Sequence, residues 1–179
     1  MNTPRIEDLI KLFNDLFQAS HHTILVLGDD EPVYLPADAA NPHHRIIFAH
    51  GYFSSALHEI AHWCVAGKRR RLLEDFGYWY RPDGRTATEQ AEFEQYEVKP
   101  QALEWLFSAT CGKSFRLSAD NLNGEPHDMR VFKQAVHQQV ATYLRQGLPK
   151  RAQMLVTELT AFYGTKDRLH LDRFVPAEC

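Results

Sequence analysis

The sequence predicts an α+β fold in which a mainly helical single domain carries a small sheet. Over several long segments the apolar residues recur at helical spacing, whereas the runs typical of strands are short, at residues 24–27, 45–49 and 77–80. The chain has 179 residues, of which 44% are apolar, and this is enough to bury one core. Because no internal repeat or Ser/Gly-rich linker interrupts it, we expect residues 1–179 to form one domain.

The N-terminal part of the chain predicts one helix followed by two strands. Residues 6–17 place apolar side chains every three or four positions, which is typical of a helix with one buried face. The β-branched run 24–27 ends at a Gly-Asp-Asp sequence that favours a turn. Three prolines between positions 32 and 42 predict an extended loop that leads into the strand at 45–49.

The next segment predicts a short helix and a strand-like stretch. The helix should begin at Ser54 or Ser55, either of which can cap it, and should end at Gly67. Residues 68–75 are expected to hold another turn, and residues 77–80 are aromatic and strand-like.

The second half of the chain is expected to be helical. Thr86 and Glu89 form a capping box, so a long helix should start there and end before Gly112. Pro100 should kink or split that helix. Further helices are expected at 128–146 and 150–163.

Charge and cysteine content exclude several classes of protein. Twenty Lys and Arg against 23 Asp and Glu give a net charge of −3, which offers no positive field for nucleic acid. No apolar run reaches about 18 residues, and the polar N-terminus does not resemble a secretory signal. The three cysteines form no C-x-x-C pair, which is typical of free thiols. We therefore expect a cytoplasmic protein that binds neither a membrane nor nucleic acid directly.

The sequence contains ten histidines, and two of them form an H-E-x-x-H motif. His58 and His62 lie four positions apart, so on a helix both imidazoles can reach one cation. Glu59 lies beside them and can act on a metal-bound water or orient a ligand. The competing interpretation is an ordinary helix with two partly exposed histidines.

A third ligand is expected from the long helix that follows Thr86. Five polar residues recur there at spacings of three and four: Gln90, Glu94, Glu97, Gln101 and Glu104. The other faces of this helix are largely apolar, so the stripe should face a cleft or a metal, although a solvated stripe remains an alternative. We select Glu97 because it is central and next to Pro100, with Glu94 and Gln101 as alternatives.

Two histidines and one carboxylate do not identify the metal. With zinc and Glu59 as general base, the site is typical of a hydrolase. With ferrous iron, open coordination positions accept dioxygen and substrate, which is oxygenase chemistry. From the residues alone, a zinc metallopeptidase of the H-E-x-x-H-plus-Glu type is the first choice. A third interpretation is a binding module in which the metal is structural or absent.

Several blocks of the sequence resemble the bacterial elongation factor P hydroxylase family. These blocks are GDDEP at 28–32, YLPAD at 34–38, HEIAHWC at 58–64, FGYWY at 76–80, PDGR at 82–85, EVKPQALEW at 97–105 and DNL at 120–122. The resemblance extends from about residue 5 to residue 165. Several blocks in one order are far more specific than the H-E-x-x-H motif alone.

The resemblance implies an iron-dependent enzyme that hydroxylates the β-lysyl-modified lysine of translation elongation factor P, its protein partner. It assigns metal ligation to His58, His62 and Glu97, with Fe(II) as the expected metal and zinc as the alternative. In a hydroxylase no water need be activated, so the catalytic role of Glu59 is to orient a ligand or hold a proton.

The sequence gives no support for 2-oxoglutarate as a co-substrate. Oxygenases that use it have an H-x-D pair and a distal histidine on a β-barrel. The H-x-D sequence in this chain is His170-Leu171-Asp172, and no histidine follows it. The expected strand content is also too low for such a barrel.

Other residues are candidates for contacts with substrate. Tyr78 and Tyr80 can line a channel for the long lysine side chain, whose stem packs on aromatic faces. Arg69 and Arg70, in a basic run after the H-E-x-x-H helix, can dock an acidic protein surface. Asp75, Asp83 or Glu104 can pair with the substrate's ammonium groups, and the competing interpretation is that each is an ordinary surface acid. His50 is a candidate neighbour of the metal site.

Overall fold

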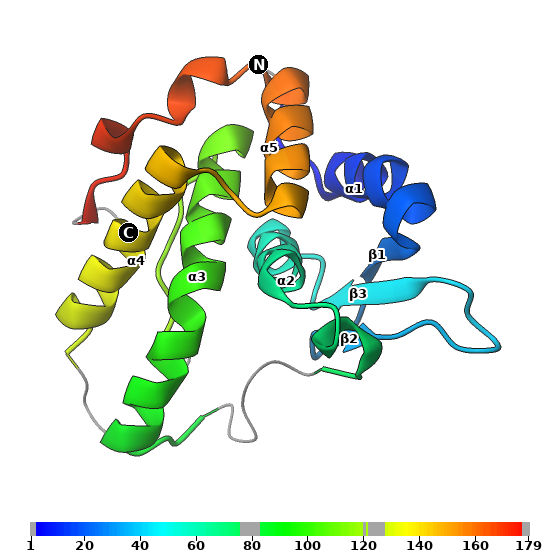
Figure 1. Cartoon of the computed structure of the whole chain (residues 1–179), viewed down its shortest axis with the longest axis horizontal. Helices are drawn as coiled ribbons and strands as arrows, with labels where there is room; N and C mark the ends of the chain where they lie inside the picture. Colours follow the sequence, from blue (N-terminus) through cyan, green and yellow to red (C-terminus); the bar gives the residue numbers. More distant parts are fainter. Residues whose placement is uncertain (1–2, 76–82, 120, 122–127, 177–179) are drawn as a thin grey trace.

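The computed structural model describes residues 3–75, 83–119, 121 and 128–176 (Figure 1). Within these residues the fold is mainly helical with a small sheet, which confirms the predicted class. The helices are α1 (Ile6–His21), α2 (Phe53–Val65), α3 (Ala87–Cys111), α4 (Arg130–Gln146) and α5 (Lys150–Tyr163). The strands are β1 (Thr23–Leu27), β2 (Val33–Leu35) and β3 (His44–Phe48). None of the described helices is long and apolar enough to span a bilayer.

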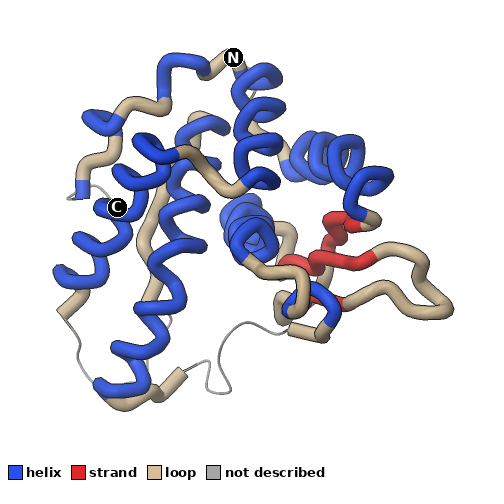
Figure 2. Tube along the Cα trace, in the orientation of Figure 1, coloured by secondary structure: helices blue, strands red, loops and turns tan. Residues whose placement is uncertain are grey.

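Helix α2, which carries the H-E-x-x-H motif, lies at the centre of the molecule between α3 and the sheet (Figure 1). The sheet and α1 lie to one side of it, and α4 packs on the far side of α3, as Figure 2 shows. Four α2 side chains are fully buried in the core: Ala56, Leu57, Ile60 and Ala61. This central position removes α2 from bulk solvent on most sides and fixes the direction of its polar residues.

The sheet has β3 in the middle, parallel to β1 and antiparallel to β2. Leu25 of β1 and Tyr34 of β2 both lie opposite Ile46 of β3. The predicted strands are confirmed, but the segment expected to be a loop contains β2. Its flanking prolines, Pro32 and Pro36, lack the N–H that a ladder requires and so confine β2 to three residues.

Helix α3 begins at the predicted capping box. The side chain of Thr86 accepts a hydrogen bond from the Glu89 amide, and the Glu89 carboxylate accepts one from the Thr86 amide. Gly112 ends the helix with a φ of 71°, a conformation that glycine adopts without strain. Pro100 does not split the helix, contrary to one of the two expected outcomes. The helix is buried on several sides around this position, and that packing offsets the lost hydrogen bond.

The ends of α2 differ from the prediction. Neither serine caps the helix: Tyr52 is the N-cap residue without a side-chain bond, and the Ser55 hydroxyl accepts from the Ala49 amide. The helix ends at Val65, before the predicted Gly67. The aromatic stretch 77–80, predicted to be strand-like, lies outside the described residues.

Candidate metal centre

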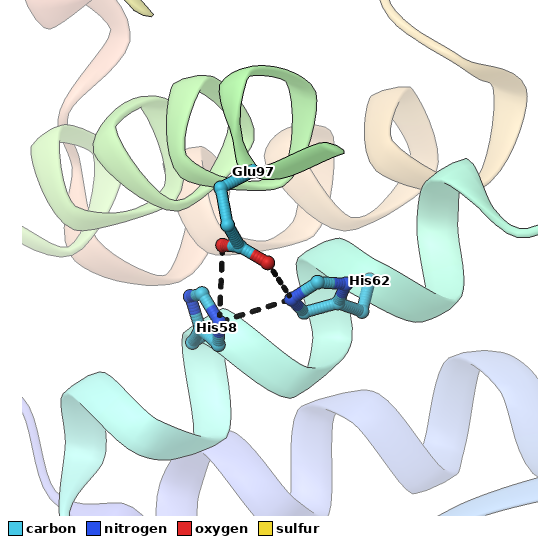
Figure 3. A group of neighbouring side chains, drawn as sticks. All are labelled: His58, His62 and Glu97. Carbon is cyan, nitrogen blue, oxygen red and sulfur yellow. Dashed lines mark hydrogen bonds and ion pairs between the residues drawn. The ribbon is translucent and has the colours of Figure 1, made fainter. Parts of the chain in front are cut away.

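The structure brings His58 and His62 of α2 together with Glu97 of α3 (Figure 3). The Nε2 atoms of the two histidines are 3.0 Å apart. Glu97 Oε1 lies 3.2 Å from His62 Nε2, and Glu97 Oε2 lies 3.6 Å from His58 Nε2. One helical turn separates the two histidines, so both rings point at the same face of α3.

This donor set fits a divalent metal ion. Two imidazole nitrogens and one carboxylate oxygen converge from two helices, and their ligand atoms all lie within 4.8 Å of one another. Such a set suits zinc or non-haem iron and leaves coordination positions for other ligands. The Glu97 side chain is only 4% exposed, so its negative charge lies where burial is costly unless a cation faces it.

The charges in the cluster depend strongly on one another. Burial opposes ionisation of Glu97, but the facing His62 and His58 rings hold its pKa at about 2. Burial likewise opposes protonation of His58, but the hydrogen bond from its ring to Glu104 and the charge of Glu97 raise its pKa to about 10. A metal ion bound by these residues would supply positive charge at the same place and would compete with the proton on His58.

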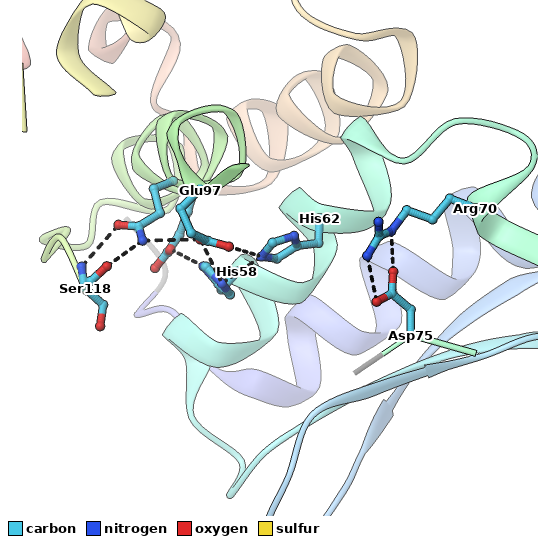
Figure 4. A network of polar contacts seen from close by, with 8 residues as sticks. His58, His62, Arg70, Asp75, Glu97 and Ser118 are labelled. Carbon is cyan, nitrogen blue, oxygen red and sulfur yellow. Dashed lines mark hydrogen bonds and ion pairs between the residues drawn. The ribbon is translucent and has the colours of Figure 1, made fainter. Parts of the chain in front are cut away.

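Glu97, labelled in Figure 4 together with Ser118, is held in place by Gln101, one turn further along α3. The Gln101 side-chain amide donates to Glu97 Oε2 at 3.3 Å and to the Ser118 carbonyl at 2.7 Å. Its oxygen accepts from the Ser118 amide at 3.1 Å. The alternative ligand Glu94 instead accepts a hydrogen bond from Gln90 at 3.2 Å. Among the three candidates for the third ligand, the structure therefore places only Glu97 in the cluster.

Glu104 lies on the polar stripe expected to face a cleft or a metal, and the structure agrees with this placement: it is 8% exposed and its Oε2 lies 2.9 Å from His58 Nδ1. The sequence does not predict this contact with His58, although Glu104 follows Glu97 by seven residues, two helical turns along the same stripe.

Glu59 lies next to the cluster but outside its hydrogen bonds. Among the described residues the Glu59 carboxylate has no hydrogen-bond or ion-pair partner, and burial raises its pKa. It lines an open groove of about 540 Å³ together with His58 and Glu104. The other walls of this groove include Pro32, Ser54, Ser55, Lys113, Phe115 and Arg116. A ligand in the groove therefore meets Glu59 and His58 at the same time.

The predicted substrate contacts have mixed outcomes. Tyr78 and Tyr80 lie outside the described residues. Arg70 pairs with Asp75, with 2.9 Å between Nη2 and Oδ1, so its charge is already compensated (Figure 4). Arg69 is exposed and remains a candidate for docking. His50 is also exposed and packs against the Tyr52 ring, so it does not belong to the metal cluster.

Comparison with known proteins relates the chain to a family of enzymes. Residues 12–174 match the family described as Elongation factor P hydroxylase. The chain is also 56% identical over 170 residues to the elongation factor P lysine hydroxylase of Haemophilus influenzae. That alignment covers 95% of this chain and 96% of the relative.

Proposed function

The chain belongs to the elongation factor P hydroxylase family, and we propose that it hydroxylates the β-lysyl-modified lysine side chain of translation elongation factor P in an iron-dependent reaction in the cytoplasm. The observation that carries the proposal is the 56% identity to a lysine hydroxylase along 95% of the chain. In this proposal residues 1–179 act as a single metal-dependent hydroxylase domain.

We assign metal ligation to His58, His62 and Glu97. Hydroxylation is an oxidation, and zinc has no redox chemistry, so the family's reaction favours Fe(II) over zinc. A bound ferrous ion would supply the activation of dioxygen, and the chain itself positions the lysine. His58 lines the groove, so a lysine side chain that lies in the groove reaches the metal cluster.

Glu59 is proposed as the catalytic carboxylate that faces the substrate. It has no partner among the described residues, and it lines the groove beside His58. A partly buried carboxylate of this kind can accept a proton from the reacting centre or hold the substrate's ammonium group. Both roles require its side chain to face the groove, where the lysine reaches the metal cluster.

The alternative function is a zinc metallopeptidase. The observation in its favour is that Glu59 follows His58, the first histidine of the H-E-x-x-H motif, and that its carboxylate has no partner among the described residues, as a general base requires. The identity with a lysine hydroxylase over nearly the whole chain makes the peptidase the weaker interpretation.

One assay separates the two functions. The protein is purified anaerobically, loaded with Fe(II) and incubated with lysylated elongation factor P, dioxygen and a reductant, and the product is analysed by mass spectrometry. A gain of one oxygen atom on one lysine supports the hydroxylase. Peptide-bond cleavage by the zinc-loaded protein, with no oxygen gained by the iron-loaded protein, contradicts it.

Variants of the ligands test the site within the same assay. His58→Ala and Glu97→Ala should each reduce hydroxylation by more than the roughly 10–100-fold that loss of an outer hydrogen-bond partner costs. His50→Ala is the matched control, because this exposed histidine lies outside the cluster and should leave the rate unchanged. Wild-type activity in either ligand variant, with folding verified by circular dichroism, would show that the ligand assignment is wrong.

A further inference from the structure

We propose that Glu104 is a positioning residue that orients the His58 ring and determines which of its nitrogens binds the metal. The inference rests on the proposed function in one respect, namely that the bound metal takes part in catalysis. Its central claim concerns metal affinity, which is measured without any substrate.

The His58 ring lies between two carboxylates of the same helix. Glu104 Oε2 is 2.9 Å from Nδ1 on one side, and Glu97 Oε2 is 3.6 Å from Nε2 on the other. Residues seven positions apart lie on the same face of a helix, so a single rigid element sets both contacts. The distance between the two carboxylates along α3 therefore fixes how far the ring can rotate.

The contact with Glu104 also fixes the protonation of the ring. An ionised carboxylate only accepts hydrogen bonds, so His58 Nδ1 must carry the hydrogen. In the neutral ring this leaves the Nε2 lone pair directed at His62 and Glu97, where the metal ligands converge. A carboxylate partner also makes the imidazole a better electron donor to a metal.

Glu104 is itself held in place. Its side chain is 10% exposed, and its helical neighbours Leu103 and Leu106 are fully buried in the core. One turn earlier, Gln101 connects the helix to the backbone of Ser118 through two hydrogen bonds. Movement of Glu104 would therefore require displacement of a packed segment of α3.

Glu104 also lines the groove, which raises the alternative that it binds a substrate cation. Its contact at 2.9 Å with His58 already commits one carboxylate oxygen. Glu59 lines the same groove without a partner among the described residues and is the better receptor for a cation. The observations therefore favour a positioning role for Glu104.

Three variants test the inference: Glu104→Gln, Glu104→Ala and the control Glu94→Gln. Glu94 is 7% exposed on the same stripe of α3 and accepts a hydrogen bond from Gln90, but it does not belong to the cluster of His58, His62 and Glu97. Metal-free protein is titrated with Co(II) in a calorimeter, and the visible spectrum of the bound Co(II) is recorded. Circular dichroism establishes that each variant is folded.

We expect Glu104→Ala to weaken Co(II) binding by about 10–100-fold and to change the Co(II) spectrum. Glu104→Gln should weaken binding less, because the glutamine oxygen still accepts a hydrogen bond from Nδ1. Glu94→Gln should match the wild type in both measurements. If Glu104→Ala does not fold, the Co(II) affinity and Co(II) spectrum of the nearly isosteric Glu104→Gln variant provide the test.

Two outcomes would overturn the inference. One is wild-type Co(II) affinity and spectrum in the folded Glu104 variants. The other is unchanged affinity together with a raised KM for elongation factor P, which would assign Glu104 to substrate binding. If instead Co(II) affinity falls as expected while wild-type protein hydroxylates nothing, the proposed function fails and the positioning role of Glu104 stands.

Discussion

Each polar side chain on the buried stripe of α3 is paired, and the pairing decides which carboxylate reaches the histidines. Glu94 is paired with Gln90, and Glu97 is paired with both Gln101 and the histidines. Glu104 accepts from His58. A buried polar group without a partner costs about 1–3 kcal/mol, so these pairings restrict the orientation of every member of the stripe.

The spacing of these residues predicts the stripe and the presence of Glu97 beside the histidines. It could not predict the direction of each side chain, which depends on what faces α3 in the folded protein. Glu104 shows this limit, because its place on the stripe is predicted but its contact with an imidazole contributed by α2 is not.

The two described cysteines are expected to be inert. Cys64 and Cys111 are buried, and burial raises the pKa of each thiol from 9.0 to about 12. Because the thiolate is the reactive form, alkylation by iodoacetamide at pH 8 should be about a thousandfold slower than in the unfolded chain. Mass spectrometry of a Cys179→Ser variant, with and without guanidinium, measures both rates.

The raised pKa of the two thiols also makes the stability of the folded protein decrease at high pH. The stability that these two buried thiols contribute is complete below pH 9 and is lost as the pH rises toward 12, because the unfolded chain ionises first. Equal alkylation rates in folded and unfolded protein at pH 8 would show that the thiols are accessible.

At the scale of elements, α2 is held at its C-terminal end by a cation from another helix. Arg151 of α5 donates from Nη2 to the carbonyls of Trp63, Cys64 and Ala66 at 2.7, 3.1 and 2.8 Å. Its guanidinium carbon lies 4.6 Å from the centre of the Trp63 ring. Positive charge at this end of a helix also interacts favourably with the helix dipole.

Replacing Arg151 should therefore destabilise the protein more than replacing its neighbour. Arg151→Met removes charged hydrogen bonds to the end of α2, and we expect the free energy of unfolding to fall by about 1.5–3 kcal/mol. Lys150→Met removes an exposed cation one position away and should change it by less than about 0.5 kcal/mol. Urea denaturation of both variants gives the comparison, and equal effects would show that the contact contributes nothing.

Local chemistry predicted some elements well and others poorly. The capping box of Thr86 and Glu89 depends on residues three positions apart, and α5 was predicted with its observed bounds, Lys150–Tyr163. Strand β2 depends on pairing with β3, so its three residues carry too weak a local signal. The contact of Arg151 with α2 joins residues 85 or more positions apart, which no local pattern contains.

For the whole molecule, the metal cluster joins its two central helices. His58 and His62 come from α2, Glu97 comes from α3, and these helices pack directly against each other. A ligand that binds only the folded arrangement stabilises it by mass action. The proposed metal binding should consequently be visible as a change in global stability, although the cluster has three candidate ligands among the described residues.

Thermal unfolding in the presence and absence of metal tests this coupling. At a free metal concentration about a thousandfold above Kd, binding adds about 4 kcal/mol to the free energy of unfolding. For a chain of this size that corresponds to a rise in Tm of roughly 8–16 °C. Scanning calorimetry with Co(II) and with a chelator measures the shift.

The Glu97→Gln variant is the control for this measurement, because it keeps the packing of α3 but loses the anionic ligand. Its Tm should not respond to Co(II). A wild-type Tm that stays constant when calorimetry shows bound Co(II) would mean that the unfolded chain binds the metal equally well.

The order of the ligands along the chain has a consequence for synthesis of the protein. Glu97 lies 35 positions after His62, so at about 5–20 residues per second the ribosome adds it roughly 2–7 seconds later. During that interval a nascent chain presents two imidazoles and no partner carboxylate from α3. If these three residues ligate a metal as proposed, an ion encountered in this period meets an incomplete set of ligands, and selective loading would wait until α3 has emerged and packed against α2.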